Sequence, residues 1–117
     1  MEVNSGDVFK TFNDDMTPPK PKFHLCINKN RFFIINSEPR KNSCNFKLSK
    51  NDCKILTKEC YIDYGRPFCR SIEDFNIIQV SELSKTALKG LIEYIKLAPT
   101  LTPILIKEIL KDLENVL

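Results

Sequence analysis

The sequence lacks the features that mark membrane, secreted and repeat proteins. It has no uncharged apolar run of about 18 residues, so we expect no transmembrane helix. Its first residues, MEVNSGDVFK, contain no apolar stretch of the kind that a secretory signal carries, and we therefore expect a cytoplasmic protein. No internal repeat and no low-complexity segment is present.

Metal ligands are few and widely spaced. The chain has one histidine, His24, and five cysteines, none of which belongs to a Cys-x-x-Cys pair. A zinc site needs four converging ligands, usually in close pairs, so we expect no metal and no other cofactor. The cysteines are better explained as reduced thiols, some of them packed as small hydrophobic residues.

The charge of the chain is unevenly distributed. The 117 residues are enough for one domain, and their net charge is +3. Residues 20–70 hold twelve Lys/Arg and four Asp/Glu, a net +8, whereas residues 1–19 are net −3, 71–80 net −2 and 81–117 neutral. A concentrated positive charge is typical of a polyanion-binding surface, although a lysine-rich solvated surface gives the same count.

A hairpin is the most clearly patterned part of the chain. Residues 23–27 alternate between large apolar and smaller or polar side chains, which predicts a half-buried strand. Residues 28–30 are a short polar turn, and the run Phe-Phe-Ile-Ile at 32–35 predicts a strand that is covered on both faces.

Polar residues lie at both ends of this hairpin. Lys20 and Lys22 precede its first strand, and Asn36 and Ser37 follow its second. Because the ends of an antiparallel pair lie side by side, these groups can meet at one phosphate. The alternative is a core hairpin whose lysines are merely solvated.

The other elements follow from periodicity and punctuation. Further strands are expected at 8–12, 44–48, 60–64 and 76–80, with a loop at 13–21, a short helical turn near 51–56 and a turn at 65–67. Apolar residues then recur at helical spacing after the cap Ser84, and a second helix begins at Thr102 with Pro103 at its first position. We expect one mainly β domain, with a small barrel of five to six strands at about 6–80 and two helices at about 81–117.

Five short motifs occur in a fixed order along these elements. They are Gly6-Asp7 before the first strand, Lys20-Pro21 before the second, Asn36-Ser37 after the third, Asp63-Tyr64-Gly65-Arg66 at a later turn and Leu83-Ser84 at the start of the helices. This order resembles the MazF/PemK-like toxins of bacterial toxin–antitoxin systems, over residues 6–95. The resemblance implies an SH3-like barrel and a homodimeric endoribonuclease that cuts single-stranded RNA without a metal and is silenced by a cognate antitoxin.

Two positions depart from the family's usual pattern. Lys20 occupies the place of an arginine, and Asn36 the place of a threonine, with Ser37 next to it. Lysine lacks the planar bidentate fork of arginine, and asparagine has no hydroxyl. The candidate catalytic residues are Lys20, Ser37, Asp63 and Arg66, and the candidate RNA-binding residues are Lys22, His24, Asn36 and Tyr64.

Metal-free RNA cleavage uses the ribose 2′-hydroxyl as its nucleophile. We hypothesise that Lys20 and Arg66 supply positive charge, that Asp63 positions or takes a proton, and that a side chain at 36–37 hydrogen-bonds a phosphate oxygen. Each residue also has a structural interpretation. His24 is either a base or a packed residue, and Asp63 and Arg66 are either catalytic or a salt bridge.

Two functional alternatives remain open. Tyr61, Tyr64 and Phe68 either stack on unpaired bases or belong to the core. The same barrel can bind nucleic acid or a protein without cutting, as a gyrase-poison-like toxin binds a protein target.

Overall fold

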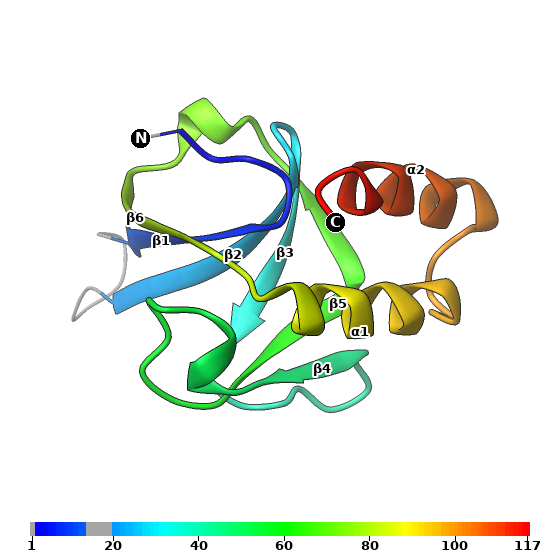
Figure 1. Cartoon of the computed structure of the whole chain (residues 1–117), viewed down its shortest axis with the longest axis horizontal. Helices are drawn as coiled ribbons and strands as arrows, with labels where there is room; N and C mark the ends of the chain where they lie inside the picture. Colours follow the sequence, from blue (N-terminus) through cyan, green and yellow to red (C-terminus); the bar gives the residue numbers. More distant parts are fainter. Residues whose placement is uncertain (1, 14–19) are drawn as a thin grey trace.

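The computed structural model describes residues 2–13 and 20–117, which form an antiparallel sheet followed by two helices (Figure 1). The strands are β1 (Asp7–Asn13), β2 (Lys20–Asn28), β3 (Arg31–Asn36), β4 (Asn45–Leu48), β5 (Cys60–Cys69) and β6 (Ile77–Glu82). The helices are α1 (Lys85–Lys96) and α2 (Pro103–Glu114), and two short 3-10 helices lie at Lys50–Asp52 and Ile72–Asp74. The mainly β fold with two C-terminal helices is therefore confirmed.

The sheet has the strand order β4-β5-β3-β2-β1-β6, and every neighbouring pair is antiparallel. It is not closed, because β4 and β6 are its two edges. The expected SH3-like barrel thus stays a prediction, while the sheet itself is established.

Both faces of the sheet are covered by apolar residues. One face, which we call the helix face, packs Leu25 and Phe33 against α1 and α2 in the larger core cluster. The opposite face, which we call the outer face, holds the smaller cluster around Phe9 and Phe32. Phe32 and Phe33 are both fully buried although they point to opposite faces, which confirms that β3 is covered on both sides.

The expected turn at residues 65–67 is wrong, because these residues lie inside the continuous strand β5. Phe32 pairs with Phe68 and Ile34 pairs with Asp63, so two steps along β3 match five steps along β5. The extra residues form a bulge rather than a reversal of the chain. A Cβ on Gly65 would lie 2.9 Å from the Thr100 hydroxyl, so the glycine serves close packing here.

The ends of several predicted segments also shift. The expected loop at 13–21 is too long, since β1 includes Asn13 and β2 begins at Lys20, and its residues 14–19 lie outside the described part. The helical turn near 51–56 is the 3-10 helix Lys50–Asp52. Both helix caps are confirmed: the Ser84 hydroxyl accepts from the Ala87 N–H and the Thr102 hydroxyl from the Leu105 N–H. Within the described ranges, no helix is long and apolar enough to cross a membrane.

Candidate nucleic-acid interface

Two neighbouring rows of side chains run across the strands on the outer face. One row pairs Phe9 with His24, His24 with Ile34, and Ile34 with Asp63. Directly paired residues of antiparallel strands point to the same face, so His24 and Asp63 share the outer face.

The second row lies two residues further along each strand and therefore on the same face. Thr11 pairs with Lys22, and Asn36 pairs with Tyr61. Lys22 and Asn36 lie one position beyond the pair formed by Phe23 and Ile35, so they are neighbours across β2 and β3. The register thus brings four of the predicted site residues together: Lys22, His24, Asn36 and Asp63.

His24 is enclosed by aromatic rings on this face. It is 6% exposed, and its imidazole is stacked on Phe9 with ring centroids 5.2 Å apart and an interplanar angle of 17°. The ring of Phe75 lies 5.1 Å away. Burial, together with the positive charges of Lys22 and Arg70, lowers the pKa of His24 from 6.5 to about 4, so the imidazole is neutral at pH 7.

A hollow of about 470 Å³ opens above His24, and we call it the outer hollow. Thr11, Lys22 and His24 line it from the strands, and Arg70 and Phe75 line it from the segment after β5. The Nδ1 atom of His24 is buried and has no hydrogen-bond partner among the described residues. The hollow therefore combines two cations and the carboxylate of Asp74 with aromatic rings and a buried polar group.

Arg70 is the site residue that the sequence did not reveal. Its guanidinium lies 4.8 Å from the ring centroid of Phe75, and Nη2 donates to the carbonyl oxygen of Asp74 at 3.0 Å. The backbone N–H of Arg70 also donates to the carbonyl of Asn30 at 3.1 Å. In the sequence, Ser71 could have indicated a capped turn here, because it caps the following 3-10 helix. A cap does not reveal where the side chain of the preceding arginine lies.

Asn36 and Asp63 are largely enclosed. The Nδ2 atom of Asn36 is buried, and no described residue forms a hydrogen bond with it. Asp63 is 8% exposed, and its Oδ1 accepts a hydrogen bond from the Gly65 N–H at 3.3 Å. None of the ion pairs among the described residues joins Asp63 to Arg66, so the structural salt bridge that we considered for them does not form.

Four predicted residues lie away from these rows or at their ends. Lys20 is exposed at the first position of β2, Ser37 is exposed just after β3, and Arg66 is exposed in the β5 bulge. Tyr64 packs with the helix-face core and meets Tyr94 of α1 edge-on, with centroids 5.9 Å apart. Burial raises the pKa of Tyr64. Tyr64 thus takes the core alternative, on the face opposite to His24.

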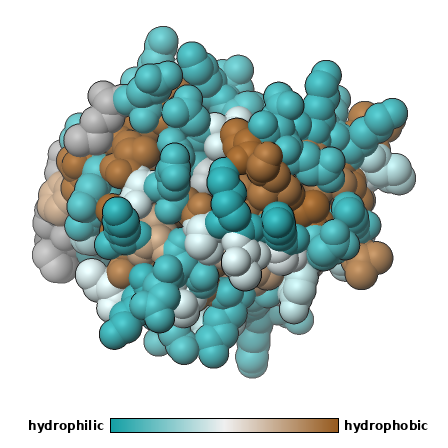
Figure 2. All heavy atoms as spheres, viewed as in Figure 1, coloured by the Kyte–Doolittle hydropathy of each residue, from teal (hydrophilic) through white to brown (hydrophobic). Residues whose placement is uncertain are grey.

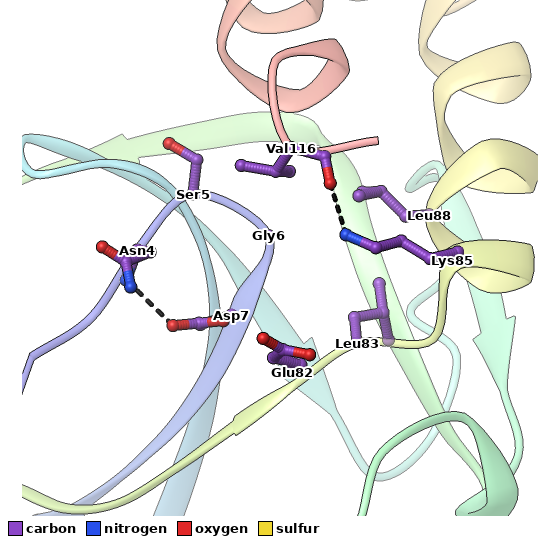
Figure 3. A pocket seen from close by; sticks show the side chains of 9 residues that line it. All are labelled: Asn4, Ser5, Gly6, Asp7, Glu82, Leu83, Lys85, Leu88 and Val116. Atoms are coloured by element: carbon purple, nitrogen blue, oxygen red, sulfur yellow. Dashed lines mark hydrogen bonds between the residues drawn. The ribbon is translucent and has the colours of Figure 1, made fainter.

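A second hollow, of about 500 Å³, lies where the N-terminal turn meets β6 and the end of the chain (Figure 3). Asp7 is 8% exposed there, pairs with Glu82 across the strands, and accepts a hydrogen bond from the Asn4 N–H at 2.9 Å. Burial is the main cause that raises the pKa of Asp7. Lys85 donates to the carbonyl of Val116 (Figure 3). The first bond closes the N-terminal turn, and the second ties the end of the chain to the start of α1.

All five cysteines are free thiols. Cys26, Cys53 and Cys60 are buried, which confirms that some of them pack as hydrophobic residues. Burial raises the pKa of Cys26 to about 12 and that of Cys60 to about 11, so neither is a reactive thiolate. Over residues 2–13 and 20–117, no three His, Cys, Asp or Glu side chains gather as metal ligands would.

Comparison with known protein families and with curated proteins found no match. The resemblance to MazF/PemK-like toxins therefore stays a prediction, and the interpretation of the outer face rests on its own geometry.

Proposed function

We propose that the chain is a toxin-like protein of the cytoplasm that binds single-stranded RNA on the outer face and cleaves it without a metal. The observation that carries the proposal is the register that brings Lys22, His24, Asn36 and Asp63 into adjacent rows, with Arg70 above them. Cations, amide groups and aromatic rings on one face are what an unpaired RNA strand requires. The SH3-like fold and the relationship to MazF/PemK-like toxins are part of the same proposal.

The proposed reaction is an internal transfer of the phosphate. The ribose 2′-oxygen loses its proton to Asp63 and attacks phosphorus, and the bond from phosphorus to the 5′-oxygen breaks. The products are a 2′,3′-cyclic phosphate and a 5′-hydroxyl, whose proton comes from Lys20. Arg66 balances the charge on the phosphate, and Ser37 or Asn36 hydrogen-bonds one of its oxygens.

Binding without cleavage is the second candidate. It is favoured by the enclosure of Asp63, which already accepts a hydrogen bond from its own strand, and by the low pKa of His24. In this version the outer face holds RNA or a protein target, as in a gyrase-poison-like toxin, and no bond is cut.

Partners of the chain are proposed on a different surface. Figure 2 shows apolar side chains over α2 among hydrophilic ones, and Leu97 and Ile104 near the helix ends are 84% and 74% exposed. Such residues suit contact with a second copy in a homodimer or with a cognate antitoxin.

The first experiment is incubation of a long single-stranded RNA with the purified protein in EDTA. We expect cleavage by the wild type, loss of at least tenfold in rate for Lys20→Ala and Asp63→Asn, and an unchanged rate for Lys89→Ala on α1. Mass analysis of the fragments then identifies the cyclic phosphate. Intact RNA with bound protein selects the non-cleaving, RNA-binding candidate. RNA that is neither bound nor cut rejects both RNA-based candidates and selects binding to a protein target.

A further inference from the structure

The outer hollow has the size and lining of a small-molecule pocket. Its volume of about 470 Å³ lies in the range of small-molecule binding sites and is larger than the space that a single phosphate fills. The rings of Phe68 and Phe75 form part of its wall and remain partly exposed. An aromatic wall of this kind gives a flat ring a surface on which to stack.

Two buried polar side chains that line the hollow, His24 and Thr11, are available to hydrogen-bond a ligand. His24 is 94% buried, and within residues 2–13 and 20–117 its Nδ1 atom has no hydrogen-bond partner. The imidazole is stacked on Phe9 on one side, and the tilted ring of Phe75 lies 5.1 Å away. Thr11, which is 7% exposed, adds a hydroxyl to the same lining. A buried group without a partner is costly, and a nucleobase edge offers both donors and acceptors.

Two cations stand at the rim. Lys22 comes from β2 and Arg70 from the segment after β5, so they approach the hollow from different elements. Arg70 is held over Phe75 and bonded to the Asp74 carbonyl, which orients its remaining N–H groups before any ligand arrives. An anion placed between the two side chains receives charge-assisted hydrogen bonds.

We infer that the outer hollow binds a single unpaired nucleotide unit, with the base inside it against Phe75 and His24 and the phosphate between Lys22 and Arg70. This inference rests on the proposed function, because the nucleotide would be one unit of the bound RNA strand. It adds a pocket for one base to the cationic groups that the proposed function places against the RNA phosphates.

His24 makes the inference measurable, because it is the only histidine in the chain. Its imidazole C–H signals in an NMR spectrum are therefore unambiguous. We would titrate the protein with each nucleoside 5′-monophosphate, with the matching nucleosides and with inorganic phosphate, up to millimolar concentrations. We expect saturable shifts with at least one monophosphate, and weaker binding, by about tenfold, of its nucleoside, which lacks the charged group.

Variants separate the pocket from general charge. Arg70→Gln and Lys22→Gln each weaken nucleotide binding by about tenfold, whereas Lys89→Gln on α1 leaves it unchanged. Both target residues are exposed, so we expect the variants to fold, and the backbone amide spectrum verifies this. Equal shifts with inorganic phosphate and with nucleotides, or no shift with any of them, would overturn the inference.

Fluorescence anisotropy with labelled single-stranded RNA, measured on the same samples, distinguishes this failure from failure of the proposed function. If RNA binds and the imidazole signals of His24 do not shift in the complex, the inferred nucleotide pocket is wrong and the proposed RNA-binding face is retained. If nucleotides move His24 but RNA neither binds nor is cut, the pocket stands and the proposed function is rejected.

Discussion

At the scale of single residues, the imidazole of His24 contacts the rings of both Phe9 and Phe75, with Lys22 and Arg70 nearby. Contact with the aromatic rings removes water from the imidazole, and the positive charges of Lys22 and Arg70 oppose a positive charge on His24. Both effects disfavour the protonated form, and burial is the larger. The histidine is therefore a neutral hydrogen-bonding group at the base of the hollow rather than a group that switches near neutral pH.

We predict that this environment makes the protein less stable in mild acid. In the unfolded chain His24 takes up a proton near pH 6.5, whereas in the folded chain it does so only near pH 4. Between these values the unfolded state holds more protons, so its free energy falls relative to the folded state as the pH drops. The free energy of unfolding should decrease by about 2 kcal/mol from pH 7 to pH 5 through this group.

Urea unfolding of the wild type and of His24→Phe at both pH values measures this contribution. The phenyl ring keeps the contacts with Phe9 and Phe75 but cannot bind a proton, so the variant lacks this part of the pH dependence. Imidazole signals that titrate near pH 6.5 in the folded protein would contradict the prediction.

At the scale of elements, the junction between the sheet and α1 depends on one cap. The Ser84 hydroxyl accepts from the Ala87 N–H at 3.1 Å and donates to Asp52 Oδ1 at 3.2 Å, and the Ser84 N–H donates to the Asp52 carbonyl at 2.7 Å. Asp52 in turn closes the capping box of the 3-10 helix with Ser49. One serine thus orients α1 on the 3-10 helix before β5.

We predict that Ser84→Ala destabilises the protein more than Thr102→Ala does. Both substitutions remove a helix cap, which costs about 1 kcal/mol, but Ser84→Ala also removes the hydroxyl that donates to Asp52 and raises the loss to about 2 kcal/mol. Denaturation by urea gives both values. Thr102→Ala is the matched control because the wild-type Thr102 hydroxyl accepts from the Leu105 N–H and makes no further hydrogen bond to a described residue. A loss for Ser84→Ala no larger than that of the control would show that Asp52 adds nothing.

At the scale of the whole molecule, charge and apolar surface occupy different parts. Residues 20–70, which contain β2 to β5, carry the net +8, while residues 81–117, which contain both helices, are neutral. Leu97 and Ile104 expose apolar surface in that helical part. A positive sheet region suits attraction of a polyanion, and the helical part is free for contact with protein.

We predict that RNA binding weakens steeply with salt. If Lys20, Lys22, Arg66 and Arg70 each neutralise one phosphate, the plot of log affinity against log salt has a slope of about −3, because single strands contribute about −0.7 per contact. Arg70→Gln should make the slope shallower by about 0.7. Anisotropy titrations over a salt series test this, with Lys89→Gln as the control. A slope near zero for the wild type would contradict binding through phosphates.

Local patterns in the sequence located the elements well. The alternation at 23–27, the double phenylalanine at 32–33 and the caps Ser84 and Thr102 all predicted what the structure contains. Strand and helix periodicity depend on neighbouring residues, so the sequence alone carries them. The hairpin also predicted that groups near Lys22 and Asn36 meet, because a short turn sets its own register.

Tertiary structure decided the rest. The bulge around Gly65, the place of Arg70 above His24 and the position of Tyr64 on the helix face all depend on how β5 pairs with β3 and on how the following segment folds back. A shift of one residue in a strand moves its side chain to the other face, and periodicity cannot reveal such a shift. The sequence therefore determined which residues form strands and helices, whereas the long-range pairing determined which of them share the hollow.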